Sequence, residues 1–354
     1  MSAPFWLSEI PVSAFERKQH VQSGMESMRL GNFVAAIASL REACLLEPEP
    51  SLLKLLAQCR YQAYLAEPPR ASVDGPWPSE TEDSFADVEG VPEIRAAELN
   101  SATLAAGIRK HGALLVRGLL SVQRASRLAT GVSQTLHACE AWHRNGGELP
   151  DSPWYSRLPL AEGCDLLHAR SWVEGAGGVW TADSPRMLYE LTEFYDTSGV
   201  QDAIAGYFGE RPLLSVGKST LRRVPATQSV GDWHQDGAFM GSDIRSVNLW
   251  LSLSRCGEDA SGLEYLPQRL QTVLPTGSHG AHFDWSVGQG MVEHTAAGMA
   301  TVSPVFDPGD ALLFDHFFLH RTGAPPGICK PRYAIESWFF APSAYPAQQV
   351  PLWL

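Results

Sequence analysis

The chain has 354 residues, which is enough for one large domain with an appendage. Hydrophobic residues make up 44% of it and charged residues 19%, a composition typical of a packed globular protein rather than a disordered one. The formal net charge of −12 repels a phosphate backbone, and basic residues do not cluster, which argues against nucleic acid as a partner.

The cysteines and the first residues of the chain bear on its compartment. No two cysteines have C-x-x-C spacing, which argues against a structural zinc site or a disulfide framework and indicates reduced thiols. The N-terminus lacks a basic start followed by an apolar run, and no stretch approaches about 18 uninterrupted apolar residues. We therefore expect a cytoplasmic protein that does not bind membranes. The six cysteines are Cys44, Cys59, Cys139, Cys164, Cys256 and Cys329.

Residues 13–66 have a helical pattern, and residues 30–50 resemble the second helix of a tetratricopeptide repeat. The helix expected at 13–28 departs from the repeat's pattern, and the helix expected at 51–66 would begin a second repeat that is never completed. Since about three repeats are needed for a stable stack, we expect this hairpin to lean on the main domain. It is either a helical cap or a docking surface for a protein partner or carrier. The residues that carry the resemblance are Gly31, Phe33, Ala36, Ile37, Ala43, Leu46 and Pro48.

Residues 67–91 are rich in Pro, Ser, Gly and acidic residues and read as a linker. Residues 144–185 show no regular spacing of apolar residues, so we expect functional loops there, which could include a substrate lid. The elements predicted around these loops are a helix at 94–110, a strand at 113–120 and helices at 121–143, 184–195 and 200–209.

From residue 213 onward the pattern changes to short strands separated by Gly, Pro and Asp turns. Such an all-β second half is typical of a sandwich or barrel. The predicted strands cover 213–224, 246–254, 262–267, 301–306, 311–320 and 332–341.

A His-x-Asp pair, His234 and Asp236, lies between glycine-rich turns. On a strand, side chains at i and i+2 point to the same face about 6–7 Å apart, so both could contact one ion. Random placement gives about half of one such pair in a chain of this composition, and a second copy is present at 282–284, so the pair alone is weak evidence.

The order of the surrounding segments separates the two copies. The first pair is followed by a strand with polar and aromatic residues at alternate positions, then by "SGLEYLPQ" and "FDPGDALLFDHFFLHRTG". Over residues 95–342 this arrangement resembles the phytanoyl-CoA dioxygenase family of Fe(II)- and 2-oxoglutarate-dependent oxygenases. The matching pieces are His234, Asp236, Gly309, Asp310, His320 and Arg332.

The resemblance implies that His234, Asp236 and His320 hold Fe(II) and leave three coordination positions open for 2-oxoglutarate and O2. His234 and Asp236 would come from one strand, and His320 from a strand that faces it across a barrel. His316 is a rival because it shares strand parity with His320. Two features favour His320: it lies at the start of the polar "RTGAPPG" segment, and it precedes Arg332 by 12 residues, close to the family's interval.

Cosubstrate recognition is assigned by the same resemblance. The guanidinium of Arg332 would form two hydrogen bonds with the distal carboxylate of 2-oxoglutarate, and the hydroxyl of Thr322 would bind the same group. Lys218 and Trp250 are further candidates for the cosubstrate pocket, although ordinary barrel packing explains them equally well.

The resemblance therefore implies an α+β fold: a double-stranded β-helix, or cupin-like jelly-roll barrel, with a helical scaffold and an N-terminal α-helical hairpin. The expected division is a tetratricopeptide-like segment at 1–66, a linker at 67–91 and an oxygenase domain at 92–354. The cosubstrates would be 2-oxoglutarate and O2.

The expected reaction is hydroxylation of an unactivated C–H of a small molecule with release of succinate and CO2. Desaturation, ring formation and epoxidation use the same centre, whereas Asp236 disfavours halogenation because related halogenases have a small residue there. Two alternatives are a catalytically silent interaction protein, which would not need to retain all four site residues, and a metal enzyme that ignores 2-oxoglutarate. The substrate stays open, because Trp172, Trp180 and Tyr189 fit a pocket or a core equally well.

Overall fold

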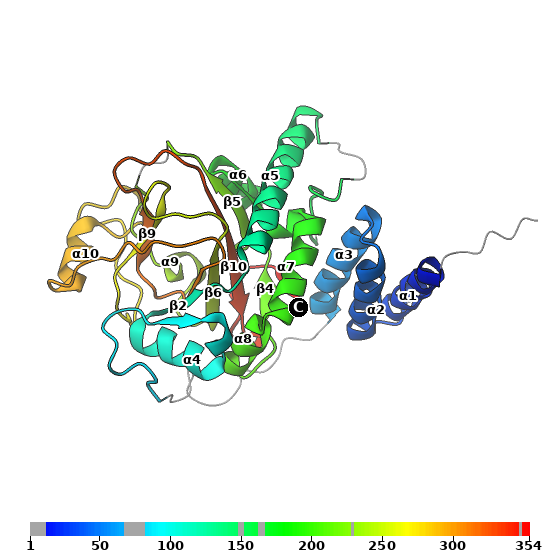
Figure 1. The fold of residues 1–354 in the computed structure, drawn as a ribbon, viewed down its shortest axis with the longest axis horizontal. Coiled ribbons are helices and arrows are strands. Elements are labelled where there is room, and N and C mark those ends of the chain that lie inside the picture. The colour runs from blue at the N-terminus through cyan, green and yellow to red at the C-terminus, as the bar shows by residue number, and fades with distance from the viewer. Residues whose placement is uncertain (1–11, 67–81, 148–151, 162–166, 228–229, 347–348) are drawn as a thin grey trace, which may run out of the picture.

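The computed structural model describes residues 12–66, 82–147, 152–161, 167–227, 230–346 and 349–354. A helical N-terminal segment packs at one end of a larger body in which helices cover a mixed sheet (Figure 1). Most of the predicted linker lies outside the described residues, and 82–91 contains neither helix nor strand. Within the described ranges, no helix is both long and apolar enough to cross a membrane.

The N-terminal segment consists of α1 (Val12–Arg29), α2 (Phe33–Leu46) and α3 (Pro50–Ala66), so the predicted helices are present. The side chain of Asn32 accepts a hydrogen bond from the Ala35 amide and starts α2. The apolar faces of α2 and α3 join one cluster with Leu213 and Trp353 of the main body, which anchors the segment there.

The helix predicted at 94–110 is wrong over its first part. Residues Glu93–Arg95 form strand β1, which pairs in parallel with β2 (Ala113–Arg117). Helix α4 (Ser101–Ala106) begins only after Asn100, whose side chain accepts hydrogen bonds from two amides of its first turn. A five-residue π-helical turn, Gly107–His111, ends it. An apolar run does not by itself separate a strand followed by a helix from one helix.

The next helices cover the sheet. The side chain of Ser121 caps α5 (Val122–Arg144), as the pattern predicted. The stretch 144–185, expected to be irregular, includes α6 (Leu167–Gly175) and β3 (Gly178–Trp180) within its described residues. Helices α7 (Pro185–Thr197) and α8 (Val200–Phe208) follow close to their predicted bounds.

Over the described residues, the large sheet has nine strands in the order β1-β2-β8-β6-β10-β4-β11, with β5 also pairing with β10 and β3 with β5. A second sheet consists of β7 and β9. The remaining strands are β4 (Leu213–Ser215), β5 (Thr220–Val224), β6 (Ser246–Ser252), β7 (Gly262–Tyr265), β8 (Ala311–Phe314), β9 (His320–Gly323), β10 (Arg332–Phe340) and β11 (Pro351–Trp353).

Contrary to the expectation, the second half of the chain is not all-β. It contains the short helix α9 (Gly237–Met240) and α10 (Gln289–Ala296), and residues 301–306 make only isolated bridges. The strand predicted at 311–320 is interrupted because Asp315 accepts hydrogen bonds from the Phe317 and Phe318 amides, its side chain from the first and its carbonyl from the second. This turn ends β8 and lets His320 begin a strand of the other sheet.

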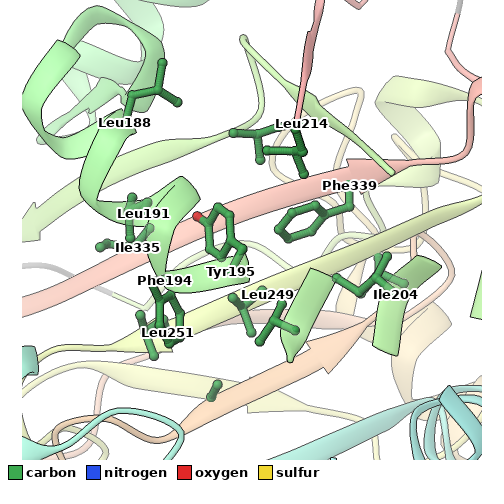
Figure 2. Packing of buried hydrophobic residues seen from close by; sticks show 14 of the residues in the cluster. Leu188, Leu191, Phe194, Tyr195, Ile204, Leu214, Leu249, Leu251, Ile335 and Phe339 are labelled. Carbon is green, nitrogen blue, oxygen red and sulfur yellow. The ribbon is translucent and has the colours of Figure 1, made fainter. Parts of the chain in front are cut away.

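Two cores lie on the two faces of the large sheet. Strand β6 is buried along its whole length, and its alternate side chains enter different cores. Leu249 and Leu251 pack under α7 against Phe194 and Tyr195 (Figure 2). Trp250 points the other way, into the cluster that lies between the two sheets. The second face therefore carries the side chains closest to the candidate site.

Candidate metal centre

Three potential metal ligands meet between the two sheets. The ligand atoms of His234, Asp236 and His320 all lie within 4.8 Å of one another. Asp236 is 4% exposed and His320 7% exposed, so both side chains are shielded from bulk water. The structure thus brings together the three residues that the sequence selected as a metal site.

The backbone geometry differs from the expectation. His234 and His320 are direct antiparallel neighbours, with the His234 amide donating to the His320 carbonyl at 3.0 Å and the reverse bond at 3.1 Å. Asp236 is not on a strand, because its backbone is helical (φ −63°, ψ −21°) where α9 begins. The ligands therefore come from one bridge and one turn, rather than from facing strands of a barrel.

Gln235 fixes this turn. Its side chain is fully buried, donates to the Thr272 and Phe317 carbonyls at 3.1 and 2.6 Å, and accepts from the Leu274 amide at 2.7 Å. The next residue, Gly237, has no room for a side chain, since a Cβ would lie 2.6 Å from Val273 Cγ2. These contacts turn the chain so that Asp236 faces the histidines.

Both histidines have the same ring orientation. Nδ1 of His234 lies 2.9 Å from the Asp232 carbonyl, and Nδ1 of His320 lies 3.0 Å from the Phe318 carbonyl. A carbonyl partner fixes the proton on Nδ1 and leaves Nε2 with its lone pair as the available ligand atom. Nε2 of His320 lies 3.8 Å from Asp236 Oδ2. Two neutral imidazoles and one carboxylate fit a divalent transition metal.

Electrostatics hold these residues in their ligating states. Burial raises the pKa of Asp236, but the attraction of Lys218, His234 and His320 outweighs it and leaves the pKa well below its ordinary range. Burial, with repulsion by His234, lowers the pKa of His320 to about 4. At neutral pH Asp236 is therefore ionised and His320 neutral. Lys218 Nζ lies 2.6 Å from Asp236 Oδ1, which leaves Oδ2 directed toward His320.

The rival histidines lie outside this cluster. The ring of His316 is buried and bonded at both nitrogens, to Ser246 Oγ at 2.8 Å and the Ser242 carbonyl at 3.1 Å. Its carbonyl accepts from the Gly237 amide, so it supports the turn after Asp236. His282, from the second His-x-Asp copy, is 81% exposed and pairs with Asp232.

Arg332 begins β10 and is 3% exposed. Among the described residues its guanidinium makes one hydrogen bond, from Nη1 to the Gly262 carbonyl at 2.9 Å, and its buried Nε has no partner. It makes no ion pair with a described carboxylate, and burial lowers its pKa. A buried cation of this kind is suited to a ligand carboxylate.

The other predicted cosubstrate residues lie in two places. Thr322 is on β9, two residues after His320, and pairs in register with Leu263. The Trp250 ring lies 5.6 Å from the Arg332 guanidinium carbon, and its buried indole N–H has no partner among the residues that the structure describes. Lys218 is instead bound to Asp236.

A cavity of about 410 Å3 lies beside the three ligands. Its walls include Lys218 together with Phe239 and Trp285, whose rings are centred 6.3 and 6.1 Å from that of His234. Trp172 of α6 lines it and is 61% exposed. Trp180 is instead a core residue, so only part of the aromatic set weighed from the sequence reaches this cavity.

Sequence reasoning missed several of these residues. Gln235 carried no signal beyond its position between two ligands. Phe239 lies on a helix too short to show a helical period of apolar residues. Trp285 directly follows the second His-x-Asp copy, which was set aside. Only its position beside His234 in the structure shows that Trp285 forms part of the cavity wall.

Comparisons with known proteins give a distant likeness. No family model and no curated protein matches the chain. Among solved structures, EctD from S. alaskensis with 2-oxoglutarate and 5-hydroxyectoine is 17% identical, with a TM-score of 0.47 over 73% of this chain and 85% of that one. AviO1 from Streptomyces viridochromogenes Tue57 is 18% identical, with a TM-score of 0.44 over 70% and 98% of the two chains.

A third solved structure is SnoK, a non-haem α-ketoglutarate-dependent carbocyclase from nogalamycin biosynthesis. It is 13% identical, with a TM-score of 0.43 over 70% of this chain and 87% of that one. At these identities and TM-scores the likeness is too remote to decide what this chain does.

Proposed function

We propose that the protein is an Fe(II)- and 2-oxoglutarate-dependent oxygenase that hydroxylates an unactivated C–H of a small molecule. The observation that carries the proposal is the convergence of His234 Nε2, His320 Nε2 and the Asp236 carboxylate beside an aromatic-lined cavity. Two imidazoles and one carboxylate are the donor set of non-haem Fe(II) oxygenases.

The protein's part in metal binding would be to present ligands that need no rearrangement. The hydrogen bonds at the two Nδ1 atoms orient the rings, and Lys218 holds Asp236 Oδ1 while Oδ2 faces the histidines. Because Asp236 supplies a carboxylate, a halide has no vacated ligand position to occupy, which disfavours halogenation. When bound, iron and 2-oxoglutarate would supply the oxidation of a C–H bond by O2, with release of succinate and CO2.

Recognition of 2-oxoglutarate is assigned to Arg332. Its unpartnered Nε and its remaining donors supply the fork that a carboxylate accepts in two parallel hydrogen bonds. Thr322 and Trp250 would flank the same carboxylate, the first with a hydroxyl and the second with an indole N–H that lacks a partner. Lys218 would act on the metal side instead, through Asp236.

The cavity supports a small-molecule substrate. A volume of about 410 Å3 is within the range of roughly 300–1,000 Å3 typical of small-molecule sites. Trp172, Phe239 and Trp285 offer flat apolar walls, while Arg222 and Glu336 on another wall form an ion pair at 3.1 Å. Desaturation, ring formation or epoxidation would use the same residues.

The two-sheet arrangement supports a double-stranded β-helix as the fold. The β7-β9 pair and the large sheet enclose one apolar cluster, to which Leu263 and Tyr265 contribute from one sheet and Trp250, Phe314 and Trp338 from the other. His320, in the smaller sheet, lies at the edge of this cluster, with its ring centred 4.8 Å from that of Phe314.

The function is tested by anaerobic reconstitution with Fe(II) and 2-oxoglutarate, followed by O2 and candidate metabolites. Mass spectrometry should detect succinate and a product heavier by one oxygen atom, and both should disappear in His320→Ala. His282→Ala is the matched control, because this histidine is exposed and outside the cluster. Oxygen consumption without succinate would show that the enzyme does not use 2-oxoglutarate. Absence of turnover and of stoichiometric iron would overturn the proposal.

A further inference from the structure

A second cluster of metal-ligand side chains lies outside the site described above. Among the described residues, the ligand atoms of Cys139, His143 and Glu174 also lie within 4.8 Å of one another. Nε2 of His143 is 3.1 Å from Glu174 Oε2, and Sγ of Cys139 is 3.8 Å from Glu174 Oε1. The cluster joins α5 to α6, which are separate in the sequence.

The spacing along α5 explains why two of these ligands meet. Cys139 and His143 are four residues apart, so they lie on one face of the helix about one turn from each other. Near the end of α6, Glu174 completes the set. The absence of C-x-x-C spacing, which argued against zinc in the sequence, says nothing of a Cys-x-x-x-His pair on a helix.

The donor set is one that zinc accepts. Sulfur, imidazole nitrogen and carboxylate oxygen bind Zn2+ at about 2.0–2.3 Å, and neighbouring ligand atoms of a tetrahedral site then lie roughly 3.3–3.8 Å apart. The two measured separations, 3.1 and 3.8 Å, are close to this range before any ion is present. The third separation, between the ligand atoms of Cys139 and His143, is within 4.8 Å, so an ion would have to draw these two side chains together.

Surrounding groups donate hydrogen bonds to one oxygen of the carboxylate, Oε1, and the other faces His143. Glu174 Oε1 accepts from Tyr155 Oη at 3.3 Å and from Arg157 Nη2 at 3.4 Å, so Oε2 stays directed at His143. Arg157 is itself held over the Trp142 ring, 4.1 Å from its centroid. Its charge opposes a cation, and burial raises the pKa of the Cys139 thiol to about 11, so an ion would have to displace that proton; the Glu174 carboxylate favours a cation. Support of a ligand by a second hydrogen-bonded group is usual at metal sites.

The cluster opens onto a cavity of about 340 Å3, which provides a route for an ion and room for a water as fourth ligand. Glu140 and Arg223 line the same cavity, and the nearest atoms of this pair are 3.8 Å apart. Gly177 and Gly178 form another part of the wall, where a Cβ would lie 2.7 Å from the Arg223 carbonyl oxygen and 3.1 Å from the Leu221 carbonyl oxygen, respectively.

We propose that Cys139, His143 and Glu174 form a zinc site, separate from His234, Asp236 and His320, that ties α5 to α6. Helix α6 also carries Trp172, which lines the cavity beside the first site. Zinc would therefore hold one wall of that cavity in place. The proposal does not depend on the proposed oxygenase activity.

The test uses the full chain with His234→Ala and His320→Ala, so that the first site does not contribute. Titration with Co2+ under anaerobic conditions should give one equivalent of binding and the near-ultraviolet charge-transfer band of a cobalt–thiolate bond. Cys139→Ser should abolish the band, and His143→Gln and Glu174→Gln should each weaken binding at least about tenfold. Cys329→Ser and His137→Gln are the matched controls, an exposed thiol and a histidine earlier on α5, and should bind as the parent does.

A second measurement guards against variants that fail to fold. Zn2+ should raise the thermal midpoint of the parent protein, because an ion that binds only the folded state stabilises it, and should leave that of Cys139→Ser unchanged. Absence of the thiolate band in the parent, its persistence in Cys139→Ser or its loss in Cys329→Ser would each overturn the proposal.

Discussion

Arg332 shows how a single side chain can indicate a missing partner. Taking a guanidinium out of water costs several kcal/mol unless its donors are used. The described residues provide it with one carbonyl, from Gly262, and leave a buried Nε unpaired. A bound carboxylate would satisfy the remaining donors.

Arg332→Lys is expected to raise the 2-oxoglutarate concentration for half-maximal succinate formation by about ten- to a hundredfold. The change keeps the charge but removes one of two parallel hydrogen bonds, which corresponds to roughly 1.5–3 kcal/mol. Iron binding should be unchanged. Arg321→Lys, whose parent side chain pairs with Glu264, serves as the control. An unchanged half-saturation in Arg332→Lys would assign the cosubstrate to another cation.

His320 makes the stability of the metal-free protein depend on pH. Its pKa is about 4 in the folded chain and 6.5 in the unfolded chain, so below pH 6.5 the unfolded chain binds a proton that the folded chain does not. The free energy of unfolding should therefore fall as pH drops from 6.5 to 4, by about 3 kcal/mol from this residue. Urea unfolding across that range should be less pH-dependent in His320→Gln. Identical slopes in the two proteins would contradict the assignment.

At this scale the sequence predicted which three potential ligands lie together, but not the backbone geometry that brings them there. His234 and Asp236 were expected to share a strand face. In the structure His234 pairs with His320 while Asp236 lies in a turn, because three hydrogen bonds of the intervening Gln235 side chain bend the chain between them. Such contacts involve residues 37 to 82 positions away, which no local pattern records.

The turn that carries Asp236 is the element on which the candidate centre depends. Gln235→Leu should leave two carbonyls and one amide without their partner, at about 1–3 kcal/mol for each group that water cannot reach. We expect a lower free energy of unfolding and at least about tenfold weaker Co2+ binding at the His234 site, measured by denaturant titration and absorbance. Gln289→Leu, at an exposed glutamine of α10, should change neither.

Elements with a regular spacing of apolar residues were predicted well. Elements whose ends depend on tertiary contacts were not. Helices α5, α7 and α8 begin and end within a few residues of their predicted bounds. The strand expected at 311–320 breaks at Asp315, whose carboxylate is buried with Arg269. A hydrophobic run does not reveal that its fifth residue will be a turn.

At the scale of the whole molecule, the N-terminal helices pack against the main body and form ion pairs and hydrogen bonds with it. Arg41 of α2 pairs with Asp196 at 2.6 Å as well as with Glu193, and Arg60 of α3 donates to the Trp353 carbonyl at 2.9 Å. The sequence predicted a segment that leans on the main domain. Whether residues 13–66 also dock a partner or carrier stays a prediction, as does the division at 67–91.

Leu56→Ala should therefore destabilise the whole chain rather than α3 alone. The side chain is 2% exposed in the cluster shared with Leu213 and Trp353, and such truncations cost about 2–5 kcal/mol. Circular dichroism and tryptophan fluorescence should report one lowered unfolding midpoint. Leu65→Ala, at a residue of the same helix that is 53% exposed, should have little effect. A separate early transition confined to helical signal would show that the segment unfolds independently.

The paired backbones of His234 and His320 have a consequence for synthesis of the chain. The two residues exchange amide-to-carbonyl bonds although 85 residues lie between them along the sequence. A nascent polypeptide that has left the ribosome only as far as residue 300 holds His234 and Asp236 but lacks the strand against which they are aligned. Under the proposed function, loading with metal would therefore be a late event in biogenesis that follows the closure of this long loop.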